Sequence, residues 1–113
     1  MAEITVRLPG RHERGFLKRL EAANSFRDRI EAQDWQTLLE FADYLIGQGY
    51  VEVPPEVEAG VEPVKDAEGN VVETAYRVAA KAALYDMTQD EVMTILVCLA
   101  NGEQRAVDPP KGG

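Results

Sequence analysis

The side chains best suited to covalent catalysis in this chain are its single cysteine, Cys98, and its single histidine, His12. A cysteine acts as a nucleophile only when a neighbouring base or positive charge favours its thiolate. Cys98 lies in the apolar stretch 92–100, whereas His12 is flanked by Arg11 and Glu13. We therefore predict a buried, inert cysteine and a solvated histidine. The chain also lacks a phosphate-binding glycine loop, a dinucleotide fingerprint and a paired-cysteine motif, so we expect no enzyme activity and no cofactor.

Acidic side chains could instead bind a metal ion, and they gather in residues 52–73, which hold seven Asp or Glu and one lysine. An EF-hand calcium loop spreads its oxygen ligands over about twelve residues. The stretch 66–70 is much shorter and is better explained as a turn. No spacing of acids elsewhere singles out a pair, so we predict no metal site.

The formal net charge of −8 is unevenly distributed along the chain. Residues 1–48 hold seven Lys or Arg against eight Asp or Glu, whereas residues 49–113 hold five against twelve. An acidic protein repels the phosphate backbone, so we expect no general nucleic-acid binding. The basic side chains of residues 7–29 alternate with acids, which is typical of a solvated helix face.

The N-terminal half predicts one strand and two helices. Apolar and polar residues alternate over 4–8, which indicates a short half-buried strand. Helical spacing follows over 12–32, although Ser25 could cap a separate second segment. The strongest amphipathic pattern covers 34–46, with Asp34 as the predicted N-cap.

The C-terminal half predicts smaller elements and one apolar helix. Thr88 and Glu91 form a capping-box pattern, and Gly102 supplies the helix exit. Between them, residues 92–100 are apolar apart from a threonine, so this helix needs cover on every side. Further elements are a strand at 50–53, a Pro/Glu-rich loop or linker at 54–63, a hairpin at 61–74 turning at 66–70, a helix at 74–85, and a flexible tail at 103–113.

These elements predict a single α+β domain over residues 1–113, mostly helical, with about four helices, a short N-terminal strand and a small central β-hairpin. By default, the helices 34–46 and 92–100 cover each other; the alternative is that they share an interface with a partner or a second copy. The predicted core is Phe16, Leu20, Phe26, Ile30, Trp35, Leu38, Leu39, Leu45, Ile46, Val92, Ile95, Leu96 and Leu99. The predicted partner contacts are Phe41, Tyr44, Met93 and Val97.

The start of the chain carries an acid and no apolar segment, so no signal peptide is indicated. No apolar run is long enough for a membrane span. We therefore expect a cytoplasmic protein with no membrane partner.

Residues 85–102 are similar to the C-terminal segment of small tail assembly chaperones of long-tailed, siphophage-like bacteriophages. Members of that family tend to end with a short helix opened by a Ser/Thr cap and acids, followed by a short polar tail. The order of strand, charged helix, amphipathic helix 35–46 and the passage 51–56 also resembles the family's layout. The resemblance implies a non-catalytic protein of the bacterial host cytoplasm that binds the tape-measure protein or the tail-tube protein and assists tail-tube assembly without a cofactor.

The resemblance also implies a longer product made by ribosomal frameshifting. Such slips need repeated bases, and the Pro, Lys and Gly codons of residues 109–112 can be homopolymeric. We therefore expect a slippery sequence in the gene at 109–112, and a flexible tail is the simpler alternative.

Two other classes of protein remain as alternatives. The opening segment 3–9 resembles the strand of ribbon-helix-helix DNA-binding regulators, in which two copies pair their strands. Carried over by position, Glu3, Thr5 and Arg7 would then enter the major groove. The third class is a structural virion protein, such as a tail or head-completion component.

Overall fold

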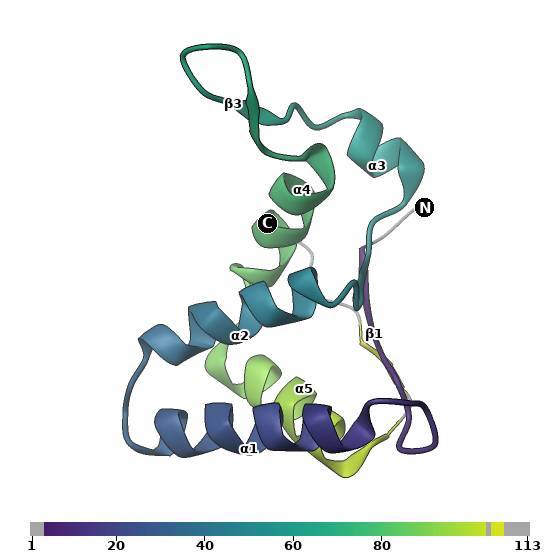
Figure 1. The fold of residues 1–113 in the computed structure, drawn as a ribbon, viewed down its shortest axis with the longest axis vertical. Helices are drawn as coiled ribbons and strands as arrows, with labels where there is room; N and C mark the ends of the chain where they lie inside the picture. The colour runs from purple at the N-terminus through teal and green to yellow at the C-terminus, as the bar shows by residue number, and fades with distance from the viewer. Residues whose placement is uncertain (1–3, 104, 108–113) are drawn as a thin grey trace.

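Figure 1 shows the computed structural model, which describes residues 4–103 and 105–107. In this part of the chain, five helices accompany two small antiparallel sheets, so the predicted α+β class is confirmed. The elements are β1 (Thr5–Leu8), α1 (Phe16–Glu31), α2 (Gln36–Gly47), β2 (Val51–Glu52), α3 (Pro55–Ala59), β3 (Val64–Lys65), β4 (Val71–Glu73), α4 (Ala75–Leu84), α5 (Gln89–Asn101) and β5 (Arg105–Val107).

The first sheet has the strand order β2-β1-β5, with β1 in the centre. Val6 and Leu8 of β1 are buried and Arg7 between them is exposed, as the alternating pattern predicts. Val6 pairs with Val51 of β2 on one side and with Val107 of β5 on the other. Both edges of β1 are therefore occupied within the chain.

A flexible tail is predicted at 103–113, and within it residues 105–107 form the strand β5 instead. Residues 105–107 pair antiparallel with β1, so the chain returns to its first strand. Such a short strand cannot show a period in the sequence, and the edge of β1 supplies its hydrogen-bond partners. Residues 108–113, and with them the segment 109–112 of the frameshift hypothesis, lie outside the described residues.

The helix α1 is continuous, so the alternative of a second segment capped by Ser25 is wrong. It begins at Phe16, after Gly15 in the left-handed conformation with φ of 87°. Ser25 therefore lies inside the helix, where its hydroxyl has no capping role.

Arg19 fixes the loop that leads into α1. Its guanidinium donates to the carbonyl oxygens of Arg14 at 2.7 Å, Gly10 at 3.0 Å and Glu13 at 3.1 Å. These acceptors replace water, so Arg19 is only 6% exposed. The prediction of a solvated basic face is wrong at this residue.

The helix α2 begins at Gln36, and its N-cap position is Trp35, which makes no side-chain cap. Asp34 does not cap the helix as predicted; its Oδ2 lies 3.4 Å from Nη2 of Arg29 instead. Within α2, Phe41 is buried and packs edge-to-face on Phe26 of α1, with ring centroids 5.2 Å apart.

The helix α3 is a second element that the sequence pattern misses, because it lies in the predicted loop or linker at 54–63. Pro55 occupies its first turn, where the missing amide hydrogen costs nothing. Glu56 and Glu58 add favourable charge at the same end. α3 packs against α4, so part of this segment belongs to the fold.

The strands β3 and β4 form the predicted hairpin, which extends away from the helices at the top of Figure 1. Asp66 Oδ1 accepts from the amides of Glu68 at 3.0 Å and Asn70 at 2.9 Å. Gly69 takes the left-handed conformation that the turn requires. The exposed valines of the hairpin are Val64, Val71 and Val72.

The helices α4 and α5 both have side-chain N-caps, and the cap of α5 is the predicted one. Thr74 accepts from the amide of Arg77 at 3.2 Å. Thr88 Oγ1 accepts from the amide of Glu91 at 3.3 Å, and Glu91 Oε1 accepts from the amide of Thr88 at 3.1 Å. Gly102 ends α5 with φ of 68°. The two ends of α5 depend only on local rules, which is why the sequence predicts them.

The core agrees with the prediction in its centre and differs at one side. Trp35 and Leu39 are 51% and 40% exposed, so their placement in the core is wrong. The apolar stripe of α2 is wider than the face that its neighbours cover. The predicted core residues that are buried are Ile30, Leu45, Ile46, Ile95, Leu96 and Leu99. The partly buried ones are Phe16, Leu20, Phe26, Leu38 and Val92.

No helix among the described residues combines the length and the apolar character that crossing a membrane requires.

Candidate functional site

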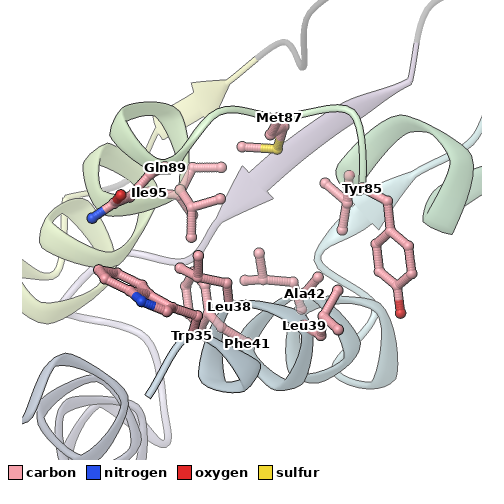
Figure 2. Close-up of a pocket in the computed structure, with 12 residues that line it drawn as sticks. Trp35, Leu38, Leu39, Phe41, Ala42, Tyr85, Met87, Gln89 and Ile95 are labelled. Carbon is pink, nitrogen blue, oxygen red and sulfur yellow. The ribbon is translucent and has the colours of Figure 1, made fainter. Parts of the chain in front are cut away.

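An apolar groove of about 220 Å³ lies between α2 and α5 and is closed at one side by the end of α4 (Figure 2). In the view of Figure 2, Trp35 and Gln89 lie at one end of the groove, Tyr85 at the other, and Met87 opposite the α2 side chains. The lining residues are Trp35, Leu38, Leu39, Phe41, Ala42, Leu45, Leu84, Tyr85, Met87, Gln89, Val92 and Ile95.

The groove exists because of how the helices pack. α5 packs mainly against α1, and α2 packs against α1 and α4. The prediction that the helices 34–46 and 92–100 mainly cover each other is therefore wrong. Since α2 and α5 pack on other helices more than on each other, the space between them is left partly open.

The floor and the rim of the groove differ in exposure. Phe41 and Ile95 on the floor are 1% and 0% exposed. On the rim, Trp35, Leu39 and Tyr85 are 51%, 40% and 48% exposed. A buried apolar floor with half-exposed aromatic side chains at its edge is typical of an interaction site rather than of an ordinary surface.

The two segments that line the groove carry charge of one sign. The segments 34–46 and 84–95, which supply every lining residue, contain no Lys, Arg or His. Their acids are Asp34, Glu40, Asp43, Asp86, Asp90 and Glu91.

Some of these carboxylates already have partners. Asp34 and Glu40 both pair with the guanidinium of Arg29. Asp43 Oδ1 accepts from the Tyr85 hydroxyl at 3.2 Å and lies 3.9 Å from Nη2 of Arg77. Burial raises the pKa of the Tyr85 hydroxyl, and the Asp43 carboxylate adds to this effect. Asp86 and Asp90 are exposed, and neither forms an ion pair with any described residue. The end of the groove near the start of α5 therefore presents unpaired negative charge.

The predicted partner contacts lie at different places. Phe41 is in the floor of the groove. Tyr44 and Met93 are partly buried against the core, and Tyr44 packs on Phe26 with ring centroids 5.5 Å apart. Val97 is 48% exposed but does not line the groove. Contact with a partner stays a prediction for all four predicted residues.

The sequence pattern misses the exposed groove residues. Trp35 and Leu39 belong to the apolar stripe of 34–46, and only the packing of neighbouring helices tells which part of that stripe is uncovered. Tyr85 and Met87 follow the last turn of α4, where no period marks them. An apolar stripe wider than one helix face is the only available signal.

The two residues best suited to covalent catalysis, Cys98 and His12, lie in different surroundings. Cys98 is 3% exposed, as predicted, and His12 is exposed in the loop before α1. Within residues 4–103 and 105–107, no group of three or more His, Cys, Asp or Glu side chains is arranged to hold a metal ion.

The pairing of β1 on both edges is relevant to the alternative of a ribbon-helix-helix DNA-binding protein. Ribbon-helix-helix dimers need this strand to pair with a second copy, and here β2 and β5 occupy both sides. Arg7 is engaged by Glu52 at 2.7 Å. Thr5 is partly buried, and Glu3 lies outside the described residues. The geometry does not favour this alternative.

No family model matches the chain, and neither a curated protein nor a solved structure matches it.

Proposed function

We propose that this protein is a non-catalytic tail assembly chaperone of a long-tailed bacteriophage. In the cytoplasm of the bacterial host, it would bind amphipathic helical segments of the tape-measure protein and keep them soluble while tail-tube subunits assemble around them. This role requires a soluble body with an accessible apolar surface, and it requires neither a cofactor nor a reaction centre.

The groove between α2 and α5 is the observation that carries the proposal. Its apolar floor and half-exposed rim suit an amphipathic helix that inserts side chains from one face. The aromatic residues Trp35 and Tyr85 at its two ends are of the types that dominate binding energy in protein interfaces. The resemblance of residues 85–102 to the chaperone family supports the same role.

The test is co-expression with the tape-measure protein encoded beside it, followed by measurement of soluble tape-measure protein and of co-purification. We expect the native chain to raise the soluble yield and to co-purify. Leu39→Asp places a charge on the groove rim and should abolish co-purification. Because Leu39 is 40% exposed, the variant should still fold, which circular dichroism would check.

Val97→Asp is the matched variant on the outer face of α5, where the side chain is 48% exposed. Loss of binding in this variant alone would move the interface away from the groove to that face. Absence of binding by the native chain would reject the chaperone.

A structural virion protein is separated from a chaperone by mass spectrometry of purified particles. A chaperone should be missing from the particles or present only in traces. A stoichiometric amount would contradict transient assistance.

A further inference from the structure

We propose that the groove between α2 and α5 selects a basic amphipathic helix of the partner, one with Lys or Arg beside its apolar face. This inference rests on the proposed function, because it names the chemistry of the segment that the chaperone would bind. It predicts a preference between two helices of equal apolar character.

The size of the groove favours a protein segment over a small molecule. Pockets for drug-sized ligands have volumes of roughly 300–1,000 Å³, whereas this one has about 220 Å³ and half-exposed walls. Such a volume accepts a few apolar side chains rather than a whole ligand. A helix can insert such side chains at spacings of three, four and seven residues while the rest of it stays outside.

The charge around the groove favours a partner helix with positive charge. The lining segments 34–46 and 84–95 contain acids and no basic residue. Asp86 and Asp90, beside the lining residues Met87 and Gln89, have no ion-pair partner among the described residues. The acids of the α2 wall are paired with Arg29 and Arg77, so the free negative charge lies at the end of the groove near Asp86 and Asp90. An acidic helix would meet like charge at this end, whereas a basic helix gains both attraction and a faster encounter.

Trp35 allows the occupancy of the groove to be measured directly. It is the only tryptophan of the chain, it lines the groove and it is 51% exposed. A helix seated in the groove should cover the indole, shift its emission to shorter wavelength and slow its quenching by acrylamide. A partner peptide without tryptophan adds no signal of its own.

The experiment titrates the full chain with two synthetic peptides of about 18 residues, or roughly five helical turns. Both carry leucines on one face and alanines elsewhere; one has lysines flanking the leucines and the other has glutamates at the same positions. We expect the lysine peptide to shift Trp35 emission and to bind at least about tenfold more tightly at low salt, with the difference shrinking as salt screens the charges.

The charge assignment is tested by a double variant, Asp86→Asn with Asp90→Asn. We expect its affinity for the lysine peptide to fall about three- to tenfold at low salt and its salt dependence to weaken. The matched control is Glu62→Gln with Glu68→Gln, which changes the net charge equally at exposed positions beside or within the β3–β4 hairpin. It should bind like the native chain.

Four outcomes would overturn the inference. Equal binding of both peptides would show a helix-binding groove without charge selection, which leaves the proposed function intact. Equal loss in the two double variants would reduce the effect to net charge. If neither peptide changes Trp35 emission, or if the emission shifts with protein concentration alone, then the groove does not take a basic helix; the second result would mean that a second copy covers it.

Discussion

The amide of Arg11 donates a hydrogen bond to the carbonyl oxygen of Gly102 at 2.8 Å, so the loop before α1 rests on the end of α5. The contact is close on both sides. A Cβ at Gly102 would lie 2.8 Å from Cε1 of Phe16 and 2.9 Å from Cα of Arg11. The exit of α5 therefore also positions the entry of α1.

Gly102→Ala should destabilise the protein strongly. The residue has φ of 68°, which costs a side chain about 1–2 kcal/mol, and overpacking against Phe16 and Arg11 adds about 1–3 kcal/mol. Urea unfolding should show the loss as a lower midpoint. Gly47→Ala is the control, because Gly47 lies in α2 with nothing within 4 Å of the added Cβ. It should leave stability unchanged or raise it by up to about 1 kcal/mol, and an equal loss in both variants would contradict the contact.

Thr88→Ala should lower the free energy of unfolding by about 1 kcal/mol, because it removes one half of the capping box of α5. Thr94→Ala is the matched control in the same helix, at an exposed position whose hydroxyl donates only to the carbonyl of Asp90. That variant should be neutral or slightly stabilising. Equal losses at both positions would mean that the cap contributes nothing.

Thr37→Val should keep or raise the stability by up to about 1 kcal/mol. Thr37 is 0% exposed, and its Oγ1 has no hydrogen-bond partner among the described residues. Replacing the hydroxyl with a methyl group removes an unsatisfied polar atom and keeps the shape. Thr37→Ser keeps the hydroxyl, loses the methyl group and should be less stable than native. If Val proves worse than Ser, the hydroxyl must have a partner, such as a bound water.

Stability should fall as the pH drops below about 4, the ordinary range of the carboxyl pKa. A side-chain hydrogen bond from Arg7 lowers the pKa of Glu52, and backbone hydrogen bonds from Asn70 and Glu68 lower that of Asp66. A group with a lowered folded-state pKa stabilises the fold above its ordinary pKa and loses this contribution as the pH falls through the folded value. Urea unfolding at pH 5, 4 and 3 would measure the loss.

The variant Asp66→Asn tests how much the hairpin turn contributes to this loss of stability in acid. The amide oxygen can still accept from the turn amides but does not titrate. Its loss of stability between pH 5 and 3 should therefore be smaller than that of the native chain. An unchanged acid response would mean that Asp66 takes no part in it.

Caesium ions should quench the fluorescence of Trp35 more strongly than iodide does. The acids of the segments 34–46 and 84–95 attract cations and repel anions close to the indole. High concentrations of an inert salt should reduce the difference. Equal quenching by both ions at low salt would contradict an acidic rim.

The elements that the sequence predicts correctly are those governed by local rules. The capping box at Thr88, the exit at Gly102 and the turn at Asp66 each depend on a few neighbouring residues. Two of the features that it misses depend on how the chain folds back on itself. β5 forms because the edge of β1 is available, and Arg19 is buried because the loop before α1 turns its carbonyls toward the guanidinium. The missed helix α3 has local signals, but its five residues are too few to show a helical period.

The same distinction explains what the sequence says about the candidate site. The apolar surplus of 34–46 and 92–100 is visible in the sequence and correctly indicates two helices that need cover. Which side chains stay uncovered depends on the neighbouring helices, because α1 packs on both α2 and α5 and α4 also packs on α2. Trp35 and Leu39 are therefore exposed although their spacing is that of core residues.

The pairing of β1 with β5 determines how the sheet responds to mechanical load. The strands are antiparallel, with Val6 opposite Val107 and Leu8 opposite Arg105. The start of β1 and the end of β5 lie at the same end of this strand pair, and the hydrogen bonds run perpendicular to the strands. A force that pulls residues 4 and 107 apart would therefore open these bonds one after another, as a zipper opens, instead of shearing them together. The strand β5 would then peel off at low force while the helices keep their packing.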